Sequence, residues 1–291
     1  MQWFQIKEQS AGKKRLILSW YLYKIFGKNV LYLIAFFVSF FTFIFSPKIR
    51  EYSKKYFNVI NLKPSLINQF KHILSYANSL VDKILVFCGD FNPDNIIFED
   101  ENDKNKLFDD ISRKKGVLLI CTHIGNIEVF YSYYLNSANK NTHANVFVNK
   151  KQGKIFAGFL ETIKTDFPVK FFPVEEISLN TGIELKENLD KGEIVFIAGD
   201  RLAQDNDTKM IKARMFEHDI LLPKGTFKLA KLMDVPTYFI SAVKLGKYYK
   251  IYLEQQNDLS QKALSDAFAQ YMEKVVKINP FQFFNFYDFF I

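Results

Sequence analysis

Residues 116–128 read Gly-Val-Leu-Leu-Ile-Cys-Thr-His-Ile-Gly-Asn-Ile-Glu, an apolar run that ends in a histidine and, five residues later, a carboxylate. The run at 117–122 predicts a buried strand, and the Gly-Asn pair predicts a turn into a helix that begins near Glu128. In this arrangement we expect Glu128 to reach back and accept one N–H of His123, which fixes the imidazole tautomer. The other ring nitrogen is then free to take a proton from a hydroxyl, so the pair is a candidate general base.

Around this stretch the sequence alternates between strand and helix patterns. Such alternation is typical of an α/β domain with a mostly parallel central sheet flanked by helices. Upstream, the pattern predicts helical structure over 49–87, a short strand at 96–98 and a helix at 106–114. Further strands are expected at 117–122, 144–149, 168–172, 194–198, 236–243 and 248–254, and helices at 126–136, 151–165, 180–190, 225–233 and 261–278. A polar cluster at 204–207 predicts an exposed loop.

The segment from Asn29 to Pro47 contains no charged residue. As a helix it would be about 28 Å long, just short of a bilayer core of about 30 Å. It predicts an N-terminal helical membrane anchor, which either crosses the bilayer or lies within one leaflet. Both flanks are basic, whereas a single crossing leaves one flank poor in Lys and Arg, so the charges favour dipping over crossing. We expect residues 1–60 to form the membrane-associating region and 61–291 the α/β domain.

The chain carries a formal net charge of +8, which suits nucleic acid, an anionic membrane surface or an acidic carrier protein. The basic residues gather on both sides of the apolar segment. The sequence contains no zinc-ligand spacing, no nucleotide-binding glycine loop and no RNA-binding aromatic motif. We therefore expect a membrane surface as a partner and no nucleic acid.

Few other residues compete with His123 for a catalytic role. His72 belongs to a helical pattern, and His143 and His218 lie among polar residues that predict loops without other metal ligands. No metal or cofactor is expected. Cys88 and Cys121 lie in apolar runs and are expected to be buried thiols. Cys121 would be a nucleophile beside His123 only if the strand continued far enough to put both side chains on one face.

Several segments resemble one enzyme superfamily in order and spacing. Residues 122–128 resemble the HxxxxD/E signature of the lysophospholipid acyltransferase superfamily, in the glutamate-bearing form of the lipid A biosynthesis (lauroyl/myristoyl) acyltransferases. Residues 191–201, which end in Asp200-Arg201, are similar to that family's strand followed by Asp-Arg. The amino-terminal half looks closer to divergent members from aryl polyene or other lipid pathways. Further similar segments are Phe216 with 222–226 and Ala230, then 235–240, and Asn279 to Phe284.

The resemblance implies transfer of a fatty acyl group from an acyl carrier protein thioester to a hydroxyl of a lipid acceptor, such as a lipopolysaccharide-like glycolipid. It places the enzyme at the cytoplasmic face of the bacterial inner membrane. His123 would be the general base and Glu128 its orienting carboxylate, and N–H groups around Gly125 would stabilise the oxyanion. The Asp-Arg pair would lie near the site. Arg201 would either bind an anionic group or pair with Asp200 to brace a loop.

The resemblance also places basic acceptor-binding residues near Lys150, Lys151 and Lys154, which are alternatively solvated charges on a helix. Two other functions fit the same motif: a lipid esterase or thioesterase that activates water, and a non-catalytic membrane-bound partner. A transferase has a further requirement, because burial stabilises an acyl chain by about 0.8 kcal/mol per methylene. We therefore expect an apolar channel beside His123, near Glu128 and Asp200, that reaches toward the anchor.

Overall fold

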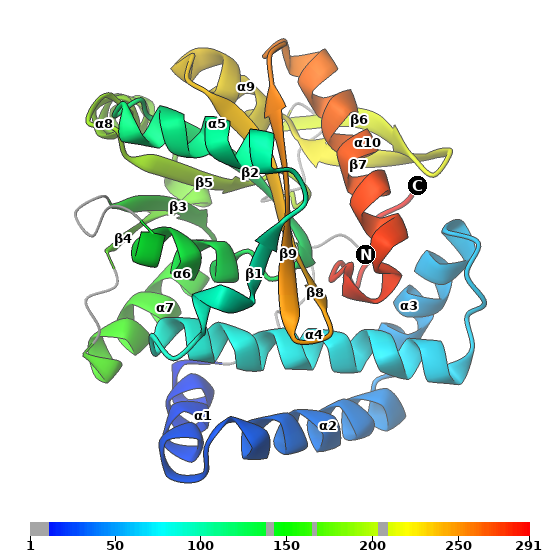
Figure 1. Ribbon diagram of the computed structural model, residues 1–291. Coiled ribbons are helices and arrows are strands. Elements are labelled where there is room, and N and C mark those ends of the chain that lie inside the picture. Colours follow the sequence, from blue (N-terminus) through cyan, green and yellow to red (C-terminus); the bar gives the residue numbers. More distant parts are fainter. Residues whose placement is uncertain (1–11, 138–142, 165–167, 203–208) are drawn as a thin grey trace.

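A computed structural model describes residues 12–137, 143–164, 168–202 and 209–291. Seven strands form one sheet with helices on both faces (Figure 1), which confirms the α/β class and the mostly parallel central sheet. The helices are α1 (Lys13–Phe26), α2 (Lys28–Phe45), α3 (Pro47–Val59), α4 (Leu66–Phe87), α5 (Glu101–Ser112), α6 (Glu128–Ser137), α7 (Lys150–Ile163), α8 (Leu179–Asp190), α9 (Lys224–Met233) and α10 (Gln261–Ile278). Short 3₁₀ turns are η2 (Pro93–Asn95), η3 (Val174–Glu176) and η5 (Pro280–Gln282).

The strand order in the main sheet is β1-β9-β8-β2-β5-β3-β4. From β8 to β4 neighbouring strands are parallel, whereas β9 is antiparallel to β8 and β1 is parallel to β9. The carboxyl ends of the adjacent strands β2 and β5 therefore meet at one edge, where open α/β sheets place their ligands. The strands are β1 (Ile96–Phe98), β2 (Val117–Gly125), β3 (Ala144–Val148), β4 (Val169–Pro173), β5 (Ile194–Ala198), β8 (Thr237–Leu245) and β9 (Tyr248–Gln256).

Alternate residues of β2 enter two different cores, because successive side chains of a strand point to opposite faces. Leu118 and Ile120 pack in the core that includes α9 and α10. Leu119 and Cys121 pack in the core that includes α4, α5 and α6. Both faces of the central strand are thus buried, which explains its nearly continuous apolar sequence.

The helix α2 lies along α4, and α4 runs across the bottom of the sheet in Figure 1. Tyr32 donates a hydrogen bond to Asp82, and eleven residues further along α2 the Phe43 ring meets Phe70, so the two helices are antiparallel. Among the described residues α2 is the one helix long and apolar enough to cross a bilayer, by length and composition alone. Its buried side chains form a single stripe, namely Leu31, Ala35 and Ser39.

Two features of the fold differ from the sequence prediction. A hairpin of β6 (Met210–Met215) and β7 (His218–Pro223) was not predicted, and His218, expected in a loop, begins β7. Its two-residue turn, Phe216-Glu217, has positive φ at both residues (51° and 63°) but lacks the Asn-Gly or Asp-Gly that marks such turns. The helical region predicted over 49–87 is broken between Val59 and Leu66, around Pro64. The loop predicted at 204–207 lies outside the described residues.

Candidate active site

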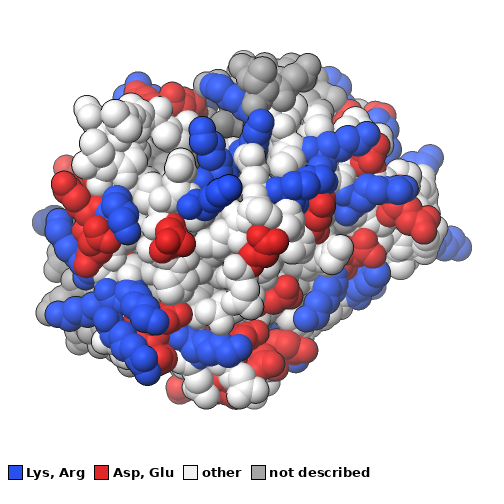
Figure 2. Space-filling model, turned by 90° about the horizontal axis from the view of Figure 1, so that it is seen from above, with Lys and Arg blue, Asp and Glu red and all other residues white. Residues whose placement is uncertain are grey.

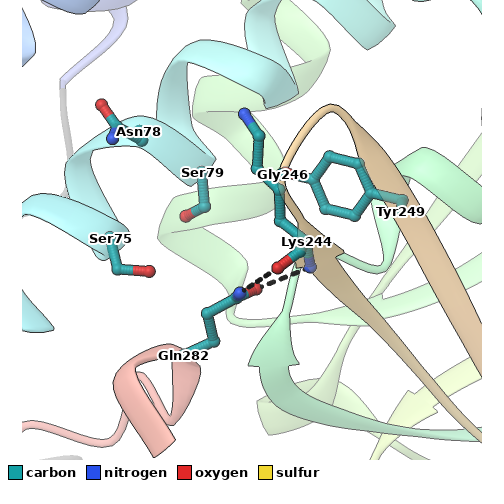
Figure 3. Close-up of a pocket in the computed structure, with 7 residues that line it drawn as sticks. All are labelled: Ser75, Asn78, Ser79, Lys244, Gly246, Tyr249 and Gln282. Carbon is teal, nitrogen blue, oxygen red and sulfur yellow. Dashed lines mark hydrogen bonds between the residues drawn. The ribbon is translucent and has the colours of Figure 1, made fainter. Parts of the chain in front are cut away.

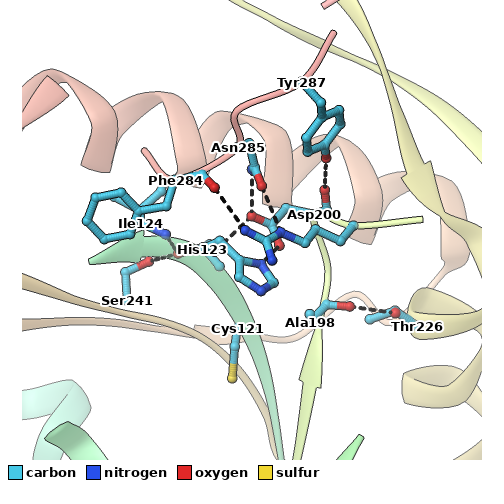
Figure 4. Close-up of polar contacts among 12 residues, drawn as sticks. Cys121, His123, Ile124, Ala198, Asp200, Thr226, Ser241, Phe284, Asn285 and Tyr287 are labelled. Carbon is cyan, nitrogen blue, oxygen red and sulfur yellow. Dashed lines mark hydrogen bonds and ion pairs between the residues drawn. The ribbon is translucent and has the colours of Figure 1, made fainter. Parts of the chain in front are cut away.

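His123 lies near the end of β2 and bonds the carboxylate of Asp200, which follows β5 (Figure 4). The Nδ1–H of His123 donates to Oδ1 of Asp200 over 2.7 Å, and the backbone N–H of His123 donates to Oδ2 over 2.8 Å. The Asp200 side chain is fully buried, whereas that of His123 is 33% exposed. The imidazole is therefore anchored on its buried side, and Nε2 is the nitrogen left to meet a substrate.

Glu128 does not take the hydrogen bond that the sequence predicts for it. It begins α6 and forms an ion pair with Lys83 of α4. The Lys83 ammonium also lies 4.4 Å from the centre of the Phe156 ring. The predicted hydrogen bond from His123 to Glu128 is thus wrong. Asp200 accepts the imidazole N–H, and Glu128 is held instead by the Lys83 ammonium of α4. Glu128 still interacts electrostatically with His123.

Burial is the main reason that the imidazole of His123 is neutral. Burial, together with the Arg201 guanidinium, lowers the pKa of His123 below its ordinary value, although Asp200 opposes the shift. Burial opposes ionisation of Asp200, but His123 and Arg201 outweigh it and lower the pKa of Asp200 to about 2. In the same way burial opposes ionisation of Glu128, but Lys83 lowers the pKa of Glu128 below its usual value. A neutral imidazole beside charged carboxylates is the protonation state that a general base needs.

Residues 283–287, which we call the strap, hold Asp200 and His123 in place (Figure 4). Asn285 Nδ2 donates to Asp200 Oδ2 over 3.0 Å, and the Tyr287 hydroxyl donates to the Asp200 carbonyl over 3.0 Å. The backbone N–H of Phe284 donates to the His123 carbonyl over 2.9 Å. The sequence prediction included residues 279–284 only as a resembling segment and missed Asn285 and Tyr287, because polar residues in an aromatic-rich segment carry no recognisable spacing.

The Arg201 guanidinium contacts the strap. Its Nε donates to Asn285 Oδ1 over 3.0 Å, and its Nη2 donates to the Phe284 carbonyl over 2.9 Å. These bonds also fix the orientation of the Asn285 amide, whose oxygen faces Arg201 and whose nitrogen faces Asp200. Arg201 thus braces the strap through Asn285 and Phe284, and the binding of an anionic group by Arg201 stays a prediction.

Gly125 and Lys150 were also expected to contact substrate. Gly125 has φ +77°, and a Cβ there would lie 1.9 Å from the Ala242 carbonyl oxygen, so glycine lets β2 approach β8 closely. The next N–H, of Asn126, donates to that same carbonyl over 2.8 Å and is not available to an oxyanion. Lys150 begins α7 and pairs with Glu176 on the surface, so the structure does not bring it together with His123.

The remaining histidines and cysteines have structural surroundings. His72 is a buried residue of α4, as the helical pattern predicted, and His143 is exposed in the loop before β3. Cys121 is buried, burial raises the pKa of its thiol well above the ordinary value, and its sulfur points away from the imidazole in Figure 4. Cys88 is a free, half-buried thiol. No three His, Cys, Asp or Glu side chains of the described residues are grouped to hold a metal ion.

Two cavities with polar linings lie in the described part of the structure, and neither is lined by His123 or Glu128. One, of about 190 Å³, lies between α4, the β8–β9 turn and η5 (Figure 3) and is lined by Ser75, Asn78, Ser79, Lys244, Gly246, Tyr249 and Gln282. The other, of about 210 Å³, lies beside β9 and α10. An apolar cluster adjoins Lys83, where Phe87 and Phe159 pack with Phe156 and Trp20. The apolar channel expected beside His123 therefore stays a prediction.

No model of a known protein family matches the chain, and no curated protein shows significant similarity to it. The resemblance to the lipid A acyltransferases therefore rests on the motif residues themselves.

Proposed function

We propose that the protein is a membrane-associated acyltransferase that moves a fatty acyl group from an acyl carrier protein thioester to a hydroxyl of a lipid acceptor. The observation that carries the proposal is the 2.7 Å hydrogen bond between His123 Nδ1 and the buried Asp200, in a histidine whose side chain is 33% exposed. An imidazole held by a carboxylate and neutral at physiological pH is suited to deprotonate a hydroxyl.

In the proposed reaction, Nε2 of His123 takes the proton of the acceptor hydroxyl while the hydroxyl oxygen attacks the thioester carbonyl carbon. A C–O bond forms and the carbonyl electrons move onto the oxygen. When the tetrahedral intermediate collapses, the C–S bond breaks and the imidazolium returns its proton to the departing thiolate. Asp200 stabilises the imidazolium between these two steps, which is the role of a carboxylate bonded to Nδ1.

The membrane part of the proposal rests on the surface of α2. The helix α2 is held along α4. In α4, Asp82 pairs with Lys244 and Lys83 pairs with Glu128, both of the sheet domain. If α2 crossed the bilayer, α4 and these charges would have to enter the bilayer with it. We therefore place α2 in the plane of the membrane, within one leaflet. Figure 2 shows the face remote from α2, where acidic and basic residues are interspersed as on a water-facing surface. The exposed apolar residues of α2 are Leu33, Ile34, Phe36, Phe37, Val38, Phe40, Phe41, Ile44 and Phe45.

The placement of α2 predicts which surface residues matter for membrane binding. Phe37 and Phe41 are 50% and 54% exposed, and replacing both with Glu should release the protein from vesicles of phosphatidylcholine and phosphatidylglycerol. Burying one such side chain stabilises by about 1.5–3 kcal/mol, so the double change should weaken partitioning by at least about 10²-fold. Leu179 and Leu232, exposed on α8 and α9, are the matched control positions, and their change to Glu should leave binding intact. Equal binding by both double variants would contradict this placement.

The product distinguishes the proposed transferase from its alternatives. Purified protein in lipid vesicles is given acyl carrier protein loaded with a labelled acyl chain, together with a bacterial lipid extract. We expect a labelled ester of a lipid, and no labelled ester from the His123→Ala variant. Release of free fatty acid alone would identify an esterase or thioesterase. No turnover with any acceptor in the extract would favour a non-catalytic membrane-bound protein.

A further inference from the structure

The cavity of Figure 3 has two walls, one of which consists of polar side chains of α4. Ser75 and Asn78 lie on this wall, and neither side chain has a hydrogen bond within the part of the chain that the structure describes. A hydroxyl and a primary amide can each donate and accept. The wall thus offers both kinds of partner to the hydroxyl groups of a ligand.

The opposite wall is fixed by hydrogen bonds. Gln282 Nε2 donates to the Lys244 carbonyl over 2.7 Å, and the Lys244 N–H donates to Gln282 Oε1 over 2.9 Å (Figure 3). The Lys244 ammonium donates to Asp82 over 2.7 Å, and the Tyr249 hydroxyl donates to the same carboxylate. The cavity is therefore formed before any ligand arrives, which reduces the cost of binding.

The charge of the cavity favours an uncharged ligand. Lys244 is the one charged residue in its lining, and its partner Asp82 is a carboxylate with a 3% exposed side chain. Because the Lys244–Asp82 pair is neutral overall, an anionic group would find no uncompensated cation in the lining. The volume of about 190 Å³ is below the range of about 300–1,000 Å³ for drug-sized ligands, and so suits one small polar group.

The cavity lies between the proposed membrane helix and the loop that carries the catalytic motif. Tyr32 of α2 lies 3.4 Å from the Lys244 ammonium. The Ser79 carbonyl accepts Nδ2 of Asn126 over 3.0 Å, and Asn126 stands between His123 and Glu128 in the sequence. Asn126 is also buried, and its amide oxygen lacks a hydrogen-bond partner among the described residues. The hydrogen bond from Asn126 therefore joins the α4 wall of the cavity to the loop between His123 and Glu128.

We infer that this cavity binds the uncharged, hydroxylated head group of the lipid acceptor, a sugar or another polyol, while the acyl chains extend toward α2. The inference rests on the proposed acyl transfer, because it assigns the cavity to the acceptor of that reaction. It explains why the uncommitted hydroxyl of Ser75 and amide of Asn78 line one turn of α4, with Lys83 about 7.5 Å beyond Asn78 along the helix axis.

Hydrogen exchange can locate the head group without catalysis. The full chain is placed in phosphatidylcholine nanodiscs that contain either glucosyl-diacylglycerol or phosphatidic acid. With the glucosyl lipid tenfold above its dissociation constant, local opening of residues 75–82 and 244–250 should slow by about tenfold. Phosphatidic acid should produce no such protection. Equal protection by both lipids, or protection by phosphatidic acid alone, would overturn the inference.

Variants test binding in the cavity independently of the transfer reaction. Asn78→Leu should fill the cavity and abolish the protection, whereas Asn180→Leu, at an exposed position of α8, is the matched control and should retain it. Ser75→Ala should reduce the protection and decides the matter if Asn78→Leu does not fold. Protection that persists in both cavity variants would refute the site. His123→Ala should keep the protection, so protection of an inactive protein would support the site even if the proposed transfer fails.

Discussion

Two histidines contact adjoining residues of one carboxyl-terminal segment, and only one of them is placed for chemistry. His72 is 1% exposed, with its Nδ1 at 2.9 Å from Ser53 Oγ and its Nε2 at 2.7 Å from the Phe283 carbonyl. His123 has a carboxylate on one nitrogen and an exposed edge on the other. Burial lowers the pKa of both. Burial and hydrogen bonding alone therefore do not make a histidine a general base. His123 differs from His72 because a charged carboxylate bonds its Nδ1 and its side chain is partly exposed.

The largest expected difference is in the rate of transfer. His123→Ala should lower the rate by about 10²–10⁴-fold, the usual contribution of a general base. It should lower the melting temperature only moderately, because the buried Asp200 loses one partner but keeps the His123 backbone N–H and Asn285. His72→Ala should instead lower the melting temperature while the rate per folded molecule is kept. Initial rates and circular dichroism melting measure the two effects. A folded, fully active His123→Ala enzyme would end the proposed mechanism.

Changing Asp200, the carboxylate that bonds His123, should have the next largest effect on the rate of transfer. Asp200→Asn should lower kcat/KM by about 10²-fold, because an amide cannot stabilise the imidazolium and can present an N–H where Nδ1 must donate. The matched change at the structural histidine is Ser53→Ala, which should leave kcat/KM unchanged. A steady-state assay on the two purified variants makes the comparison. If both changes cost the same, the distinction drawn between the two histidines is wrong.

His72 should contribute to the pH dependence of stability in mildly acid solution, and His123 adds to it with the same sign. The pKa of His72 is about 4 when folded and near 6.5 when unfolded, so protons bind the unfolded chain preferentially between these values. The stabilisation is complete above about pH 6.5 and falls by about 3 kcal/mol as the pH drops to 4. His72→Phe should flatten this slope, although it should also lower stability at neutral pH by leaving Ser53 and the Phe283 carbonyl unpaired. Urea unfolding at several pH values tests this, and an unchanged slope would contradict it.

Glu128→Gln should have the smallest effect of these changes, a loss in kcat/KM of less than about tenfold, because Glu128 acts on His123 only through space. Removing its charge should lower the pKa of His123 further, so the acid limb of the activity profile should move to lower pH. A pH series of kcat/KM measures both quantities. A loss as large as that of Asp200→Asn would restore Glu128 as the orienting carboxylate.

Much of the sheet follows from the sequence, since buried parallel strands leave continuous apolar runs. The strand at 194–198 and the helix at 261–278 have the predicted bounds, and β2 extends three residues beyond its prediction because Gly125 continues the pairing with β8. The hairpin 210–223 was missed because its turn uses Phe216 and Glu217 where glycine is usual. The local sequence pattern therefore predicts helices and strands well and turns poorly.

The site was only partly predictable for a different reason. His123 was identified from its position after an apolar strand, and Asp200 and Arg201 were identified from the resemblance of residues 191–201 to a family motif. Which carboxylate meets the imidazole depends on helix packing, because Lys83, remote in sequence, holds Glu128. Strand adjacency was the one available signal, since the ends of neighbouring parallel strands share an edge.

The strap has a consequence for how the protein is made. The His72–Phe283 hydrogen bond joins residues 211 apart in sequence, and Asn285 and Tyr287 reach back to Asp200. Chains are synthesised from the amino end, so the carboxylate behind His123 acquires these two partners only after residue 287 has emerged from the ribosome. Contacts between residues this distant in sequence also form slowly, because the chain must first lose the entropy of closing a long loop. A nascent chain therefore carries every described strand of the sheet before Asp200, the partner of His123, has all of its own hydrogen-bond partners.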